Sequence, residues 1–174
     1  MKQHNGMRPH DIVVLLKILV TSDDWLNKDL AKSLYISTSE ISESLNRSKI
    51  AGLIDLTKRT VFKKNLLDFL SQGLSYVFPV QAGALVRGIP TAHSAPVFKD
   101  ALIAEDVYVW PYAAGTKKGQ AVQPLYPNSV LAVQKDEKLY DVLALVDALR
   151  IGKVREREIA INKLADIFKQ EYAH

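Results

Sequence analysis

The stretch NKDLAKSLYISTSEISESLNRSKIAGLI, residues 27–54, decides the fold. Its apolar residues recur at helical spacing on both sides of Tyr35-Ile36-Ser37, which indicates two short helices joined by a tight corner. We expect the first helix over residues 28–34, with Asn27 as its N-cap. Three residues form its inner face, Leu30, Ala31 and Leu34.

The second helix of this pair carries its own start and stop signals. Ser37 is a suitable N-cap, and Glu40 stands three residues later, so that together they make a capping box. The helix is expected to run over residues 38–51 and to stop at Gly52. Two apolar residues four positions apart pin its inner face, Ile41 and Leu45. Its outer face is therefore left free.

Elements on either side complete a small α+β unit. Upstream, Pro9 suits the first turn of a helix. Apolar residues follow it at helical spacing, Ile12, Leu15, Leu16 and Leu19. This pattern predicts an amphipathic helix before the pair. Downstream, residues 53–56 and 61–62 read as two short strands, and residues 57–60 form a tight basic turn between them.

The pattern resembles the winged-helix regulators of the MarR-like type. The shared features cover about a third of the chain: Leu30-Ala31, Leu34, Ile36-Ser37, Ser39, Ile41-Ser42, Leu45 and Gly52-Leu53-Ile54. The resemblance implies a DNA-binding winged helix-turn-helix over residues 8–62, with a recognition helix at 38–51 and a wing at 56–61. It places eight side chains against base edges or phosphates: Thr38, Ser39, Ser42, Asn46, Arg47, Lys49, Lys58 and Arg59.

Three positions depart from that family pattern. Tyr35 stands where the turn usually carries glycine, and a left-handed backbone costs a tyrosine more, so we expect a slightly reshaped turn. Ser48 stands where an inward leucine is usual. Glu40 and Glu43 lie on the helix that should approach a polyanion, which predicts weak or conditional affinity. A plain three-helix bundle and a protein-docking module remain the alternatives.

Composition fits a DNA-binding role and excludes several others. The chain of 174 residues has no cysteine, which rules out disulfides and thiolate chemistry and suits a reducing compartment. Its net charge of +4 lies in the first 64 residues, with 11 Lys and Arg against 7 Asp and Glu, whereas the remainder balances at 12 each. Such an asymmetry favours a phosphate-binding N-terminal part. No segment reads as a membrane span, so we expect a cytoplasmic protein that does not bind membranes.

The remaining residues, 63–174, predict a second, mainly helical domain with long loops, so the whole chain is expected to be α+β and mostly α. Helical patterns occupy residues 63–74, 128–134, 139–151 and 155–172, and residues 106–110 alternate like a strand. Residues 79–100 and 111–127 read as irregular loops rich in Gly and Pro. The last two helices form either a hairpin on their own domain or a homodimer interface.

One loop has the composition of a binding site. Arg87, Thr91, His93 and Ser94 could form a pocket for a small-molecule effector or a surface for a protein partner, since they combine a guanidinium, an imidazole and hydroxyls. The other interpretation is an ordered loop whose polar groups satisfy the backbone. Gly115-Thr116-Lys117-Lys118-Gly119 lacks phosphate-loop spacing and reads as a flexible basic loop.

Three function classes follow, and the first is favoured. The chain is a DNA-binding transcriptional regulator, or an antitoxin-like or adaptor protein that binds another protein, or an enzyme built on Arg87 and His93. The four histidines are scattered, and the sequence has no nucleophile elbow. The adjacent carboxylates Glu105-Asp106 and Asp136-Glu137 do not face each other on a helix or strand, so neither makes an acid/base couple. We therefore expect no catalytic residues, no metal and no cofactor.

Overall fold

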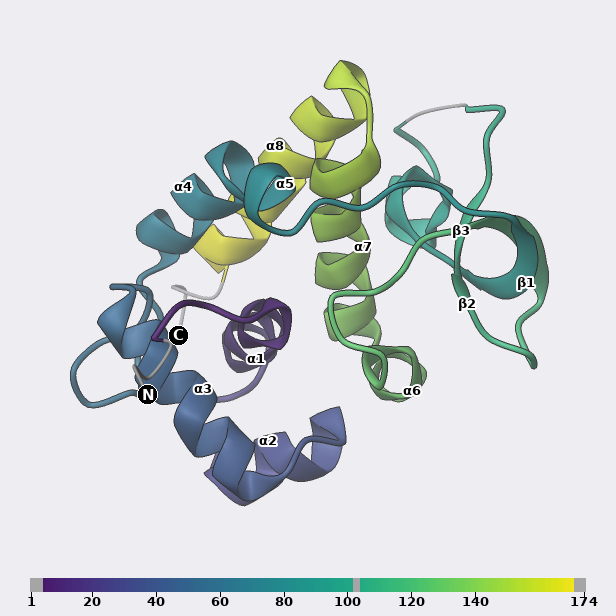
Figure 1. The fold of residues 1–174 in the computed structure, drawn as a ribbon. Coiled ribbons are helices and arrows are strands. Elements are labelled where there is room, and N and C mark those ends of the chain that lie inside the picture. The colour runs from purple at the N-terminus through teal and green to yellow at the C-terminus, as the bar shows by residue number, and fades with distance from the viewer. Residues whose placement is uncertain (1–4, 102–103, 171–174) are drawn as a thin grey trace.

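The computed structural model describes residues 5–101 and 104–170, and the fold is α+β and mostly α, as predicted (Figure 1). The N-terminal elements are α1 (Pro9–Leu19), α2 (Asn27–Leu34), α3 (Thr38–Ile50), α4 (Lys63–Gln72) and α5 (Leu74–Val77). The strands are β1 (Leu85–Pro90), β2 (Tyr108–Pro111) and β3 (Lys117–Ala121), with short 3-10 turns at Ala92–Ser94 and Pro96–Phe98. The chain continues with α6 (Ser129–Val133), α7 (Glu137–Ile151) and α8 (Val154–Gln170).

Helix α1 lies in the centre of the molecule and is buried on all sides. Five consecutive residues, 12–16, have no exposed surface, so the expectation of an amphipathic helix was wrong. The reason is that α2 and α3 pack on one side of α1 while α7 packs on another (Figure 1). The hydrophobic core therefore continues across the predicted boundary between residues 62 and 63. An ion pair of 2.5 Å between Lys17 and Asp136 also joins the two parts.

The corner between α2 and α3 forms with tyrosine in the left-handed conformation. Tyr35 has φ 57° and ψ 41°, so the corner keeps the backbone that glycine usually supplies instead of being reshaped. Helix α3 begins with Ser37 as its N-cap, as predicted, because the Ser37 hydroxyl accepts a hydrogen bond from the Glu40 N–H at 3.2 Å. The reciprocal bond of a capping box does not form, because the Glu40 carboxylate bonds Arg47 and His10 instead. Helix α2 differs slightly: Leu26 is its N-cap rather than Asn27, because the Asp29 carboxylate accepts the Leu26 N–H.

The wing is smaller than the sequence predicts. A single antiparallel bridge, Ile54 to Val61, replaces the two expected strands. Gly52 ends the preceding helix with φ 76°, a left-handed conformation that glycine adopts without strain. The turn is closed by Asp55, whose carboxylate accepts hydrogen bonds from the N–H groups of Arg59 and Thr60 at 2.8 and 2.9 Å. These side-chain bonds take the place of a longer strand ladder.

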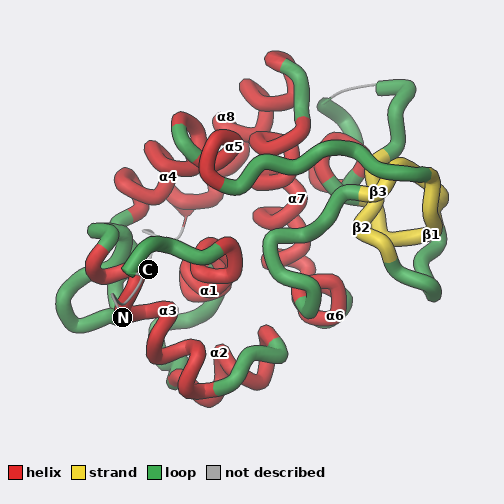
Figure 2. The backbone as a smooth tube through the Cα atoms, viewed as in Figure 1, coloured by secondary structure: helices red, strands yellow, loops and turns green. Residues whose placement is uncertain are grey.

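Both segments predicted as irregular loops contain strands. β1 pairs antiparallel with β2 and with β3, and β2 and β3 pair in parallel, which closes a small three-stranded barrel (Figure 2). The sequence conceals this because the strands are short and interrupted by Gly and Pro. Gly88 is required here: a Cβ at this position would lie 2.0 Å from the carbonyl oxygen of Trp110. Gly88, which the sequence pattern assigns to a loop, thus marks a point where two strands approach closely.

The C-terminal helices agree with the predicted pattern within a few residues. α7 is buried along most of its length, and α8 packs against it and against α4. The predicted end of the last helix at Tyr172 lies outside the described residues. None of the helices in the described part of the chain combines the length and the apolar character needed to cross a membrane.

The left-handed Tyr35 yields a stability prediction. Tyr35→Gly and Tyr35→Ala both remove the aromatic ring, but only alanine keeps the Cβ that strains a left-handed backbone. We expect Tyr35→Gly to be more stable than Tyr35→Ala by about 1 kcal/mol in urea unfolding. Equal stability of the two variants would show that the corner relaxes to another conformation.

Candidate nucleic-acid interface

Helix α3 is held from one side and is uncovered on the other. Its inner face consists of Ile41, Ser44, Leu45 and Ser48, all of which are buried. Ser48 occupies the inward position expected of a leucine, and the hydroxyls of Ser44 and Ser48 have no hydrogen-bond partner among the described residues. The opposite face carries exposed or partly exposed side chains: Thr38, Ser39, Ser42, Glu43, Asn46, Lys49 and Ile50. Five of the predicted DNA-binding residues lie together on this face.

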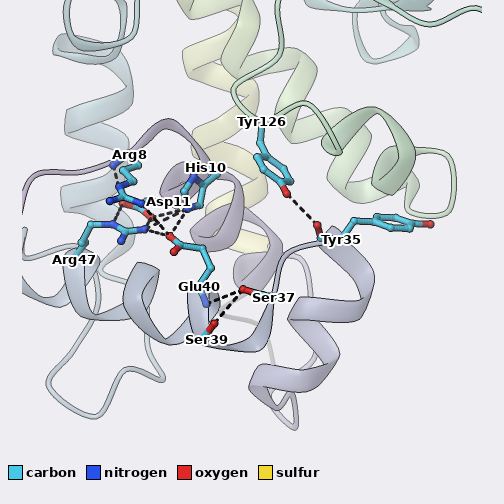
Figure 3. A network of polar contacts seen from close by, with 9 residues as sticks. All are labelled: Arg8, His10, Asp11, Tyr35, Ser37, Ser39, Glu40, Arg47 and Tyr126. Carbon is cyan, nitrogen blue, oxygen red and sulfur yellow. Dashed lines mark hydrogen bonds and ion pairs between the residues drawn. The ribbon is translucent and has the colours of Figure 1, made fainter.

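Arg47, also predicted to face DNA, is instead directed into the protein, which corrects that expectation. The residue is only 6% exposed. Its guanidinium donates to both carboxylate oxygens of Asp11, at 2.9 Å from Nε and 2.8 Å from Nη2, in a bidentate pair (Figure 3). Asp11 has no exposed surface, so the pair is desolvated. Arg47 therefore links α3 to α1, and its Nε and Nη2 donors are engaged within the protein.

Glu40 extends this ion pair toward the surface. Its carboxylate accepts a hydrogen bond from Arg47 at 2.5 Å and contacts the His10 ring nitrogen at 2.8 Å. Burial acts to raise the pKa of Glu40, but the hydrogen bonds from Arg47 and His10 outweigh burial and hold the pKa below its usual value. The hydrogen bond to Asp11 raises the pKa of Arg47 still further above neutrality. Glu40 is thus engaged within the protein, which removes one of the two carboxylates expected to oppose DNA.

The grouping of His10, Asp11 and Glu40 has the residue types of a metal site. Its two carboxylates, however, are already paired with two arginines, Arg47 and Arg8. One ligand atom from each lies within 4.8 Å of the others. The Arg47 guanidinium bonds to both carboxylates of the group. A metal ion would have to share this space with a cation that has its own fixed hydrogen bonds. The arrangement is therefore a structural ion-pair network.

Both predicted cations of the wing are accessible, and Arg59 is the one that is held in place. It lies 3.9 Å above the centre of the Trp25 ring and donates to the carbonyl oxygens of Asp23 and Trp25 at 2.8 Å each. Arg59 is nevertheless exposed, so its contact with phosphates stays a prediction. Lys58 sits at the tip of the turn with φ 60° and is partly exposed. It remains a candidate phosphate contact.

Residues from the C-terminal part hold the corner before α3. The Tyr126 hydroxyl donates to the Tyr35 carbonyl oxygen at 3.0 Å (Figure 3). The Asn128 amide donates to the same oxygen at 3.1 Å. The Tyr126 ring also lies 5.7 Å from the His10 ring, measured between centroids. Sequence reasoning missed this clamp, since nothing in the sequence signals a contact across about 90 residues. The clamp makes the position of α3 dependent on the second half of the chain.

The residues of the second predicted site are only partly brought together. Thr91 donates to the buried carboxylate of Asp147 at 2.8 Å, and the Ser94 hydroxyl accepts the Tyr108 N–H at 2.9 Å. One His93 ring nitrogen contacts the Asp106 carbonyl oxygen at 2.6 Å, whereas His93 Nδ1 is buried without a hydrogen-bond partner among the described residues. His93 and Ser94 line one cavity, and Arg87 stands apart on the barrel and is exposed. Both interpretations of this loop therefore stay predictions.

The buried pair predicts a large cost for losing Arg47. Arg47→Met leaves the Asp11 carboxylate desolvated without a counter-charge, and we expect a loss of about 3–5 kcal/mol in urea unfolding. Lys49→Met, on the exposed face of the same helix, should cost less than about 1 kcal/mol. Adding Asp11→Asn to Arg47→Met should recover part of the loss. Equal losses of stability in Arg47→Met and Lys49→Met would contradict the buried ion pair.

Asp55 predicts that the wing turn is sensitive to acid. Hydrogen bonds from the Thr57 hydroxyl and from the Thr60 and Arg59 N–H groups lower the pKa of Asp55 from 3.8 to about 2. Because the folded pKa is depressed, its stabilisation is complete above pH 3.8 and is lost as pH falls toward 2. The Asp55 carboxyl carbon should titrate in NMR with a midpoint near 2. A midpoint near 3.8 would contradict the closed turn.

Comparisons of the chain with protein-family models, with curated proteins and with solved structures gave no match. The interpretation of the site therefore rests on its geometry and chemistry.

Proposed function

We propose that this chain is a transcriptional regulator that binds duplex DNA through the outer face of α3, in the manner of a MarR-like winged helix. One observation carries the proposal: α3 is pinned from its inner side, while its outer side is free of the rest of the described chain. A helix of 13 residues held in this way has the dimensions to enter a major groove. The role implies a cytoplasmic protein that uses no catalytic residue.

The side chains on the outer face suit the reading of base edges. Asn46 can bond an adenine through its amide, and the hydroxyls of Thr38, Ser39 and Ser42 can donate or accept. Lys49 adds a cation near the end of the helix. With Arg47 buried in its ion pair and the exposed Arg59 hydrogen-bonded to backbone carbonyls, Lys49 and Lys58 are the cations of the predicted set whose side chains form no hydrogen bond or ion pair within the described part of the chain. We therefore expect modest affinity that weakens steeply with salt.

A homodimer is part of the proposal, since regulators of this type read two half-sites related by the symmetry of the pair. Ligand control would act through the Tyr126 and Asn128 contacts to the Tyr35 carbonyl, because these connect the second half of the chain to the corner before α3. A small-molecule effector or a protein partner that moves this segment would change the position of the recognition helix.

A second candidate function is that of an adaptor that binds another protein with the same region. The observation that favours it is the exposure of three apolar side chains: Ile50 at 56%, Leu56 at 87% and Phe62 at 43%. A protein partner would cover them, whereas a DNA phosphate would not. Co-purification of one stoichiometric protein, together with no duplex binding at low salt, would favour the adaptor.

Opposite charges on the outer face of α3 test DNA binding in both directions. Glu43→Gln removes a carboxylate that opposes phosphates and should tighten duplex binding, whereas Lys49→Gln should weaken it, each on the order of threefold at low salt. Fluorescence anisotropy with labelled random duplex measures both effects. Lys64→Gln is the charge-matched control on α4, where Lys64 pairs with Asp68. If neither α3 variant differs from this control, DNA does not lie on that face.

A further inference from the structure

The strands of the small barrel carry cations and no acidic residues. Residues 69–99 and 107–135, which contain all three strands, include no Asp or Glu. Three cations project from these strands with exposed side chains: Arg87 on β1 and Lys117 and Lys118 at the start of β3. The loop before β2 contains carboxylates, and Asp106 from this loop lines a cavity together with Lys117. The locally positive surface is therefore that of Arg87 and Lys118.

Two of these cations face each other directly across the sheet. The register of the antiparallel pair β1–β3 places Arg87 opposite Lys118. Directly opposed residues share one face of a sheet with their Cβ atoms about 5 Å apart, and like charges in such a pair destabilise it. Arg87 reaches only the Gly115 carbonyl oxygen, at 3.5 Å, and none of the three cations forms an ion pair within the described part of the chain. An anion bound between Arg87 and Lys118 would relieve their repulsion.

We propose that this basic barrel face, formed by Arg87 and Lys118, binds the phosphate backbone of the same duplex that α3 reads, outside the base pairs under α3. This inference rests on the proposed function. Duplex DNA is the occupant that fits best, since it offers one charge per about 1.7 Å of its axis and needs no apolar surface on the protein. Charge dominates the barrel face, where Leu85 is the exposed large apolar side chain on these strands.

The position of the barrel makes the inference testable by duplex length. α3 and the barrel lie at opposite ends of the molecule, with α6 and α7 between them (Figures 1 and 2). A long duplex that passes from α3 toward the barrel offers its phosphates to both surfaces and should release more counterions on binding than a duplex that only fills the groove under α3.

The experiment measures affinity against salt by fluorescence anisotropy, with duplexes of about 12 and about 40 base pairs, or just over one and about four helical turns. Wild type should show a steeper salt dependence on the long duplex. Arg87→Gln should reduce the slope of log K against log salt by about 0.9 on the long duplex and leave the short one unchanged. Lys64→Gln, which removes an ion-paired cation on α4, should leave both slopes unchanged.

The variant Lys118→Glu distinguishes a loss of DNA affinity from a loss of stability. It replaces a like-charge pair by an opposite-charge pair with Arg87, so the melting temperature should rise while affinity for the long duplex falls. Barrel variants that bind both duplexes like wild type would overturn this inference and leave α3 binding intact. Tighter binding of polyglutamate than of the long duplex would also overturn it, in favour of an acidic protein partner. Wild type that binds neither duplex at low salt would overturn both proposals.

Discussion

The complete burial of α1 is the constraint on which the rest of the structure depends. A helix that is apolar all round must be covered all round, and residues 12–16 have no exposed surface. The corner formed by α2 and α3 covers one side, and α7, from the far end of the chain, covers another. Neither half can be removed without exposing this core. We therefore expect the N-terminal helices and the C-terminal part to unfold together.

That shared core explains how α3 is positioned for its proposed role. The Asp11–Arg47 pair fixes α3 against α1 in a geometry that a purely apolar contact would leave less defined, and Glu40 and His10 extend it to the surface. The pair orients α3, but it engages the Arg47 cation, which is then not available to DNA phosphates. The clamp from Tyr126 to the Tyr35 carbonyl adds a second constraint, from a segment that follows directly on the barrel.

Local patterns predicted the N-terminal helices closely and failed where contacts are distant. Helical spacing and the Ser37 cap located α3 to within a residue of its observed end. The inward direction of Arg47 was not predictable from α3 alone, because its partner lies 36 residues away; the Asp11 carboxylate within an apolar run was the available signal. β1 and β3 were missed since close approach demands glycine at positions such as Gly88, and glycine usually indicates a loop.

The most direct test of the account is an amide NMR map of the protein titrated with a duplex of about one and a half helical turns. If α3 binds DNA, shift changes should concentrate on the outer face of α3, at residues such as Ser39, Ser42 and Asn46, and at the wing tip near Lys58. Amides in the middle of α7 should not move. Changes confined to the C-terminal helices, or no changes at low salt, would contradict the claim that α3 binds DNA.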